Sequence, residues 1–267
     1  MNNFISLGLA CLFFFSIFTT PADATDITCW FPPSWLAKSS QAKVITDALS
    51  DHSGLTIRPR IAPSYPEILR SFASDQANIV YVGSFVQAII KDRGIGVPLA
   101  QNKNGKEFYS GVLVYPKGLD PAAILKNDPE KIAFAKGASS GESSAKAATV
   151  GKAAMPTPNH DATCKAVEAG AAKAGVVKNW WWEANKQNHP GLDMYKIPDI
   201  SIEKNPDNVL TASNAISAED RQKIVAAAIA AKNTFGAPEM VPFDASSLDF
   251  SIELMKKGNI DPHNYQW

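Results

Sequence analysis

The sequence has few of the residues that build disulfide-rich or metal-binding proteins. Its 267 residues include three cysteines and four histidines. No two cysteines form a Cys-x-x-Cys pair, which excludes a disulfide scaffold, a zinc ribbon and a c-type haem attachment site. The histidines show no metal-ligand spacing. We therefore expect neither a bound metal nor a cofactor.

An excess of charge of either sign is also absent. The chain has 26 basic and 26 acidic residues, and only five of the basic residues are arginines. No net field therefore favours nucleic acid or an anionic membrane surface. With 45% hydrophobic and 19% charged residues, the composition is that of a folded globular protein. These values predict a soluble α/β or mixed protein of one or two lobes, with no nucleic-acid partner.

The longest uncharged apolar run lies at the N-terminus. It spans residues 4–18, which is 15 residues, whereas a membrane span needs about 20. Ala22-Asp23-Ala24 follows it with the small-x-small pattern of a cleavage site. We expect residues 1–24 to be a signal peptide. An uncleaved anchor is an alternative, because no Lys or Arg precedes the run, and a lipoprotein through Cys11 is another.

Removal of residues 1–24 would leave two cysteines, Cys29 and Cys164. Export would place both in an oxidising compartment. They are 135 residues apart, and the sequence does not show whether they meet. A disulfide and two buried free thiols both remain open.

Strand and helix patterns alternate along the mature chain. Such alternation is typical of parallel sheets with crossover helices. Serines or aspartates precede several helices, and we expect Ser64, Ser84, Asp161 and Ser217 to be N-caps. The expected strands are 27–31, 55–61, 79–82, 109–115, 131–135 and 174–177, and the expected helices are 37–49, 65–72, 85–91, 142–150, 161–169, 217–232 and 246–255.

Two segments, 115–120 and 209–214, could carry the chain between lobes. The first lobe would then consist of residues 25–115 and 212–267, and the second of residues 116–211. This organisation predicts a cleft between the lobes, where ligands bind at the carboxyl ends of strands.

A Gly/Ser-rich segment, Gly137 to Ser144, follows an expected strand and opens a helix. Unpaired N–H groups and the helix dipole favour an anion at such a position. The segment also matches the G-x-S-x-G elbow of hydrolases, with Ser139 as nucleophile. An ordinary serine-capped helix is the third interpretation. We expect Glu142 to face away from a bound anion, or to pair with a cationic part of the ligand.

Two further features are candidates for the site. His160 directly precedes an expected helix and could donate to an anion, although such a histidine is more often a surface or capping residue. Trp180, Trp181 and Trp182 are adjacent, and successive residues turn about 100° on a helix or 180° on a strand. The three indoles therefore cannot share one core face. At least one should face solvent, the cleft or a partner. We expect at least one to report on the cleft, and Trp180 is the candidate.

Five motifs, in this order, resemble the phosphate/phosphite/phosphonate-binding family of ABC-transporter periplasmic substrate-binding proteins. The similarity covers about residues 27 to 232. The motifs are a helix beginning at Tyr65, Asn78-Ile79-Val80-Tyr81-Val82-Gly83-Ser84, Phe108-Tyr109-Ser110-Gly111-Val112-Leu113-Val114, Ile132-Ala133-Phe134 with Ser139-Ser140-Gly141, and Asn159-His160-Asp161-Ala162.

This resemblance implies a type II periplasmic-binding fold: two α/β lobes, joined by a two-strand hinge, that close on a small oxyanion. It implies a monomeric periplasmic protein that delivers its ligand to an ABC-transporter permease. Two departures argue against an aminophosphonate ligand. The family usually has an acidic residue at the place of Lys173, and its aminophosphonate binders have another within the stretch that corresponds to 179–182. By position, the implied ligand contacts are Tyr65, Ser84 and Tyr109 in the first lobe, and Ser139, Ser140, Ser143 and His160 in the second.

Two other functions remain open. The same fold could hand its ligand-bound form to a sensor kinase, because transport and sensing both require only ligand-driven closure. A secreted serine hydrolase would need Ser139 with Asp193 or Asp244 and with His263, but no His-Gly-Gly-Gly oxyanion segment precedes the serine. We therefore expect a binding protein and not an enzyme.

Overall fold

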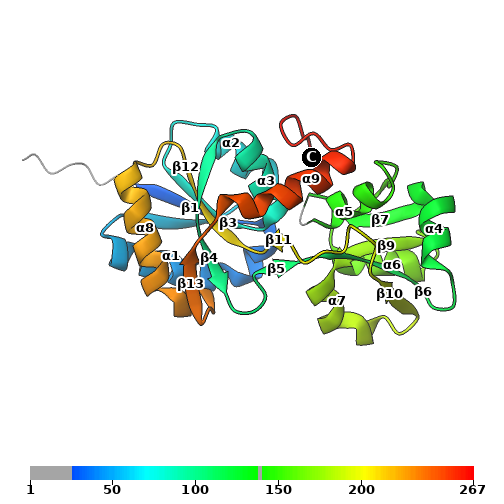
Figure 1. Cartoon of the computed structure of the whole chain (residues 1–267). Helices are drawn as coiled ribbons and strands as arrows, with labels where there is room; N and C mark the ends of the chain where they lie inside the picture. The colour runs from blue at the N-terminus through cyan, green and yellow to red at the C-terminus, as the bar shows by residue number, and fades with distance from the viewer. Residues whose placement is uncertain (1–25, 138–139) are drawn as a thin grey trace, which may run out of the picture.

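The structure is a computed structural model that describes residues 26–137 and 140–267. Figure 1 shows two lobes side by side, each with its own sheet and its own helices. The expected signal peptide at residues 1–24 lies outside the described residues. Within the described ranges, no helix is long and apolar enough to cross a membrane.

The first sheet has six strands in the order β13-β4-β12-β3-β1-β2. β1 is parallel to β2 and β3, whereas β12 and β13 are antiparallel to their neighbours. The sheet is therefore mixed and not parallel as expected, because β12 and β13 return from the far end of the chain. The strands are β1 (Ile27–Phe31), β2 (Ile57–Ile61), β3 (Asn78–Val82), β4 (Gly96–Lys103), β12 (Val209–Ser213) and β13 (Glu239–Pro242).

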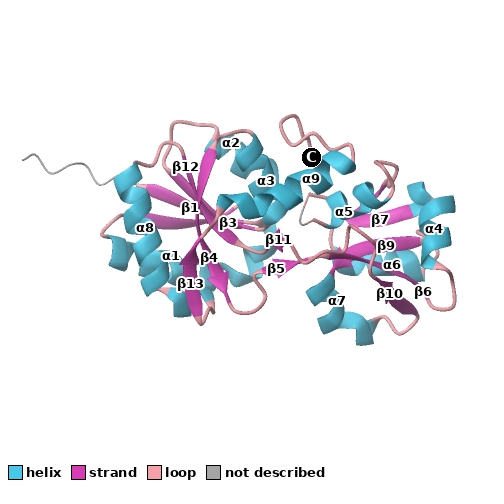
Figure 2. Ribbon diagram, in the orientation of Figure 1, coloured by secondary structure: helices cyan, strands magenta, loops and turns pink. Residues whose placement is uncertain are grey.

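Helices cover both faces of this sheet (Figure 2). Side chains alternate between the faces of a strand. Cys29 and Phe31 of β1 therefore pack with α1 (Ser39–Ser53) and α8 (Ala218–Ala230). Trp30 packs on the opposite face with α2 (Tyr65–Phe72) and α3 (Ser84–Asp92).

The second sheet has five strands in the order β10-β6-β9-β7-β8. α4 and α5 contribute to the core on one of its faces, and α6 and α7 contribute to the core on the other. The strands are β6 (Gly111–Pro116), β7 (Ile132–Ala135), β8 (Met155–Thr157), β9 (Ala174–Lys178) and β10 (Leu192–Tyr195), and the helices are α4 (Pro121–Asn127), α5 (Gly141–Ala148), α6 (His160–Glu168) and α7 (Asn179–Asn185).

The chain passes between the sheets at β5 (Phe108–Tyr109) and β11 (Asn205–Pro206), which pair antiparallel. The expected boundaries at 115/116 and 211/212 are displaced from these crossings. β6, which ends at Pro116, belongs to the second sheet, and β12, which begins at Val209, belongs to the first. The expected crossing at 115–120 is instead the end of β6 and the turn after it, where Gly118 has a φ of 84°.

The C-terminal segment contacts both lobes, although the sequence placed it in the first lobe alone. α9 (Asp249–Lys257) lies against α5 and α3. Leu254 belongs to a core cluster of the second lobe, whereas Met255 and Ile260 belong to one of the first. In Figure 1 this red segment lies over the junction between the lobes.

Helix starts follow the sequence signals, but the capping contacts differ. Ser217 caps α8 as expected, because its Oγ accepts the backbone N–H three residues on, at 3.1 Å. Ser64 precedes α2 but makes no capping hydrogen bond. Asn159, not Asp161, caps α6. Ser84 is the first residue of α3, with a glycine before it at the cap, so its hydroxyl is free for another contact.

Candidate functional site

A cavity of about 470 Å³ lies between the two lobes. Both lobes and the connecting segments line it, which is the usual position of a ligand site. From the first lobe come Pro32, Pro33, Ser34, Trp35, Tyr65, Val82 and Gly83; from the second come Ala135, Lys136, Pro158, Asn159, His160 and Lys178; and from the connections come Tyr109, Asp207 and Asn208.

Tyr109 brings three of the expected site residues together. Its Oη lies 2.8 Å from Ser84 Oγ, at the start of α3. The same oxygen accepts the backbone N–H of Ser140, directly before α5, at 3.0 Å. The tyrosine hydroxyl therefore joins the N-termini of two helices, one from each lobe. Helix N-termini present unpaired N–H groups and a partial positive charge, and both properties favour an anion.

Two of the expected residues have buried polar atoms without a partner. Ser140 Oγ and His160 Nδ1 make no hydrogen bond to any described residue, and the same holds for Ser144 Oγ. Such an atom costs about 1–3 kcal/mol when it is left unsatisfied. Ser143 differs, because its hydroxyl donates to the Ser140 carbonyl at 3.1 Å. Ser139 lies outside the described residues.

Glu142 corrects one expectation, since it does not face away from the loop. Its side chain is 1% exposed and lies inside the structure. Oε2 accepts the Gly137 N–H at 2.9 Å and the Tyr265 hydroxyl at 2.8 Å. Oε1 lies 3.1 Å from Lys146 Nζ. Glu142 thus holds the start of the loop and links it to the C-terminal segment.

Tyr65 lines the cavity, and it is backed by an aromatic group that the sequence did not predict. Its ring stacks on Trp267 with the centroids 5.8 Å apart. Burial raises the pKa of Tyr65 to about 12, so its hydroxyl remains a donor at neutral pH. Trp267 also lies against Gly137, which has a φ of 64° and where a Cβ would collide with the indole. A glycine is required there for both reasons.

The positive groups of the cavity are lysines. Lys136 follows β7 and Lys178 ends β9, so both stand at the carboxyl ends of neighbouring parallel strands. Lys178 Nζ lies 2.6 Å from Asp207 Oδ1. The same ammonium lies 4.3 Å from the ring centroid of Tyr109 and 4.5 Å from that of Trp180.

His160 is held neutral in this environment. Burial, and then the nearby charge of Lys178, lower its pKa to about 4. A neutral imidazole has one donor and one acceptor nitrogen. Its ring packs against Trp181, with centroids 5.5 Å apart. At neutral pH His160 therefore offers a ligand a hydrogen bond and not a charge.

The three adjacent tryptophans diverge from α7, as their spacing predicts. Trp182 is 4% exposed and belongs to the core of the second lobe. Trp181 lies between His160 and His189. Trp180 contacts Tyr109 edge-on, with centroids 6.1 Å apart, and thus lies behind a residue of the cavity wall.

The two cysteines are free and buried in different lobes, Cys29 in β1 and Cys164 in α6. The disulfide left open by the sequence is therefore absent. His263, the expected histidine of a hydrolase triad, lies 3.8 Å from Asp92 and not beside Asp193 or Asp244. No cluster of three or more possible metal ligands occurs in residues 26–137 and 140–267.

Comparison with known families decides between the remaining functions. Residues 37–247 match the family described as "ABC transporter, phosphonate, periplasmic substrate-binding protein". The chain belongs to this family. It is a periplasmic substrate-binding protein of the phosphonate ABC-transporter class and not an enzyme, so the hydrolase interpretation of Ser139 is not supported. A search of curated protein sequences found no match.

Solved structures with the same architecture include two phosphonate-binding proteins. PhnD1 from Prochlorococcus marinus, in complex with methylphosphonate, is 15% identical with a TM-score of 0.66 over 89% of this chain and 99% of that one. The binding protein of a phosphonate ABC transporter from Pseudomonas aeruginosa is 17% identical, also with a TM-score of 0.66, over 89% and 87%. A Xanthomonas citri protein bound to ATP is 12% identical with a TM-score of 0.70 over 88% and 97%. These similarities confirm the type II periplasmic-binding fold.

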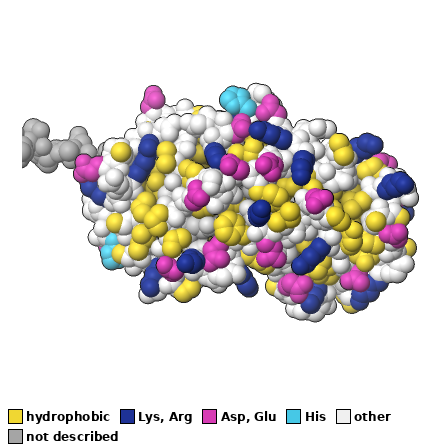
Figure 3. Space-filling view, viewed as in Figure 1, with side chains coloured by type: hydrophobic (Ala, Val, Ile, Leu, Met, Phe, Trp, Pro, Cys, Tyr) yellow, Lys and Arg dark blue, Asp and Glu magenta, His cyan; other side chains and the backbone are white. Residues whose placement is uncertain are grey.

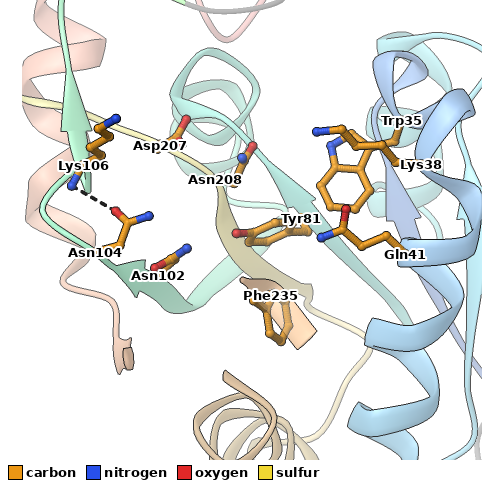
Figure 4. Close-up of a pocket in the computed structure, with 10 residues that line it drawn as sticks. All are labelled: Trp35, Lys38, Gln41, Tyr81, Asn102, Asn104, Lys106, Asp207, Asn208 and Phe235. Atoms are coloured by element: carbon orange, nitrogen blue, oxygen red, sulfur yellow. Dashed lines mark hydrogen bonds between the residues drawn. The ribbon is translucent and has the colours of Figure 1, made fainter. Parts of the chain in front are cut away.

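A smaller pocket adjoins the cleft of this binding protein (Figure 4). Its volume is about 170 Å³, and it shares Trp35, Asp207 and Asn208 with the larger cavity. Figure 4 shows Asp207 and Asn208 between Lys106 on one side and Trp35 on the other. The Oδ1 atom of Asn102 is buried there without a partner among the described residues. Polar groups thus continue beyond the main cleft.

Lys136, Lys178 and Asp207 were not predicted as site residues. None of the five arginines lies in the motifs. A usable signal was present, because Lys136 directly follows one short buried strand and Lys178 is the last residue of another. Residues at the carboxyl ends of such strands line ligand sites in α/β folds.

Proposed function

We propose that this binding protein captures a phosphonate-like oxyanion between its lobes, at the paired N-termini of α3 and α5. One observation carries the proposal: Ser140 is 1% exposed, and its hydroxyl has no partner among the described residues. A phosphonate oxygen would satisfy this hydroxyl, and it would replace Tyr109 Oη on the Ser140 N–H. The proposed ligand contacts are Tyr65, Ser84, Tyr109, Ser140, Ser143 and His160, with Trp180 supporting the wall; Ser139 stays a sequence-based candidate.

The connection between the lobes supports a closing motion. β5 and β11 form a two-stranded ribbon that adjoins the cavity through Tyr109 and Asp207. Rotation about a few residues of such a ribbon is a common way for two lobes to close on a ligand. We take residues 26–107 and 207–248 as the first lobe and 110–204 as the second, with the C-terminal segment shared between them.

The partner proposed for the closed form is the permease of an ABC transporter, and the protein acts as a monomer after removal of residues 1–24. On the face shown in Figure 3, basic and acidic side chains are interspersed. This distribution fits the balance of 26 basic and 26 acidic residues, and it does not favour a nucleic-acid partner.

Calorimetry with methylphosphonate and phosphate tests the proposal. Hydrogen bonds to a charged group contribute about 1.5–3 kcal/mol, so Ser140→Ala should weaken binding about tenfold or more. Ser74→Ala, on an exposed turn of the first lobe, is the matched control and should leave binding unchanged. If neither anion binds the wild type, or if Ser140→Ala binds as tightly as the wild type, the oxyanion site is not at α5.

A further inference from the structure

Lys178 occupies a position that has the features of a cation-binding site. Its Nζ lies 2.6 Å from Asp207 Oδ1 and within 4.5 Å of the ring centroids of Tyr109 and Trp180. A carboxylate together with two aromatic faces is the arrangement by which proteins hold ammonium groups. The side chain of Lys178 is only 19% exposed, and Lys178, Asp207 and Tyr109 all line the cleft.

Backbone contacts hold the surrounding groups in place. Asn179 directly follows Lys178, and its N–H donates to the Ser110 carbonyl at 3.0 Å, while its side-chain Oδ1 accepts the Ser110 N–H at 3.2 Å. The N–H of Asp207 donates to the Glu107 carbonyl at 2.8 Å. The lysine and its carboxylate are thus each tied to the segment that contains β5, so the ammonium is fixed relative to Tyr109.

We propose that Lys178 fills this cation site from within the protein and thereby selects phosphonates that carry no ammonium group. This inference rests on the proposed function. A ligand ammonium would meet the positive charge of Lys178, and it would find Asp207 already paired. An ammonium has three hydrogen-bond donors. Among the described residues, the Lys178 ammonium donates to Asp207. Lys178 therefore has donors left for an anionic group at the far end of a ligand, and Lys136 adds a second positive charge to the cavity.

Three ligands with the same phosphonate and a two-carbon tail test the proposal. Ethylphosphonate has a neutral tail, 2-aminoethylphosphonate a cationic tail and phosphonoacetate an anionic tail. By calorimetry, the wild type should bind ethylphosphonate and phosphonoacetate at least tenfold more tightly than 2-aminoethylphosphonate.

Variants of Lys178 separate this role from simple packing. Lys178→Met keeps the aliphatic stem but removes the charge, so it should gain at least tenfold for 2-aminoethylphosphonate and lose at least tenfold for phosphonoacetate. Ethylphosphonate should change less than threefold. Lys178→Arg should keep the wild-type order of ligands, and Lys173→Met, at an exposed lysine of the same lobe, should match the wild type. The gain for 2-aminoethylphosphonate should vanish in Lys178→Met/Asp207→Asn, which lacks the carboxylate.

Two results would overturn this inference but leave the proposed function standing. One is wild-type protein that binds 2-aminoethylphosphonate as tightly as ethylphosphonate, a comparison that needs no variant to fold. The other is a Lys178→Met protein with the wild-type ratio between these ligands. If none of the three phosphonates and no phosphate binds the wild type, the proposed function fails and this inference fails with it.

Discussion

At the scale of single residues, His160 couples the cleft to pH. Its pKa is lowered to about 4 by burial and by Lys178, whereas an imidazole in an unfolded chain titrates near 6.5. Between these values the unfolded state binds a proton that the folded state does not. The stability supplied by the neutral ring is therefore complete above pH 6.5 and is lost as the pH falls toward 4.

We expect this loss to disappear in His160→Gln. Urea denaturation at pH 7, 5.5 and 4.5 measures the free energy of unfolding. Between pH 7 and pH 4.5 this free energy should fall by on the order of 1–3 kcal/mol more in the wild type than in the variant. His52→Gln, at the exposed end of α1, is the control and should follow the wild type. An identical pH dependence in wild type and His160→Gln would show that the ring is not held neutral by its surroundings.

Some site residues could be predicted because their position follows from local structure. Ser84 and Ser140 stand where a strand turns into a helix, and that junction alone places them at a helix N-terminus. The inward orientation of Glu142 could not be predicted in this way, since it depends on Tyr265, which lies 123 residues away in the chain. The ion pair of Lys178 could not be predicted either, because its partner Asp207 comes from the returning connection.

At the scale of elements, α7 directs three adjacent indoles into different surroundings. A helix turns about 100° per residue, and as a result Trp182 lies in the core, Trp181 against His160, and Trp180 behind Tyr109. Of the three, Trp180 is in contact with the wall residue whose hydroxyl meets α5. Its emission should therefore respond when a ligand displaces that hydroxyl.

We expect the change in fluorescence on addition of methylphosphonate to vanish in Trp180→Phe and to persist in Trp182→Phe. The second variant is the control, because its indole is buried away from the cavity. Calorimetry on Trp180→Phe should confirm that the ligand still binds. A full signal in Trp180→Phe would assign the response to another tryptophan, such as Trp35 in the cavity wall.

Among the strands, sequence patterns identified several short apolar runs but missed β4, β8, β10, β11 and β13, and they gave the region of β12 only as a segment between the lobes. β4 contains Pro98, which argues against an interior strand because proline has no N–H to donate to a neighbouring strand. In the structure Pro98 is opposite Thr211, beside the register shift in β12, and bulges are among the places where a strand tolerates proline. Such a pairing is not visible in either strand by itself.

At the scale of the whole molecule, the C-terminal segment is a third connection between the lobes. Arg93 of the first lobe donates to the Tyr265 carbonyl at 2.8 Å, while the Tyr265 hydroxyl donates to Glu142 of the second at 2.8 Å. One residue thus bonds to both lobes beside the Gly/Ser-rich loop. A movement of one lobe relative to the other would therefore act on this contact.

Tyr265→Phe should therefore lower the free energy of unfolding by about 1–2 kcal/mol, as expected when a buried carboxylate loses a donor. Urea denaturation measures the loss. Tyr195→Phe is the matched control, because no hydrogen bond links the Tyr195 hydroxyl to another described residue, and it should change stability little. Equal stability of Tyr265→Phe and wild type would mean that the bond to Glu142 does not hold the lobes together.

The position of β12 has a consequence for the order in which the molecule assembles. β12 lies between β3 and β4, yet the chain reaches it only after all five strands of the second sheet. As the chain emerges from the ribosome or from an export channel, the second sheet is complete first, and the first remains divided between β3 and β4. Formation of the first sheet must wait for this long-range pairing, which is slow because a large loop has to close. The half-formed sheet would expose strand edges during that interval, and it is the part of the newborn protein that most needs protection from aggregation.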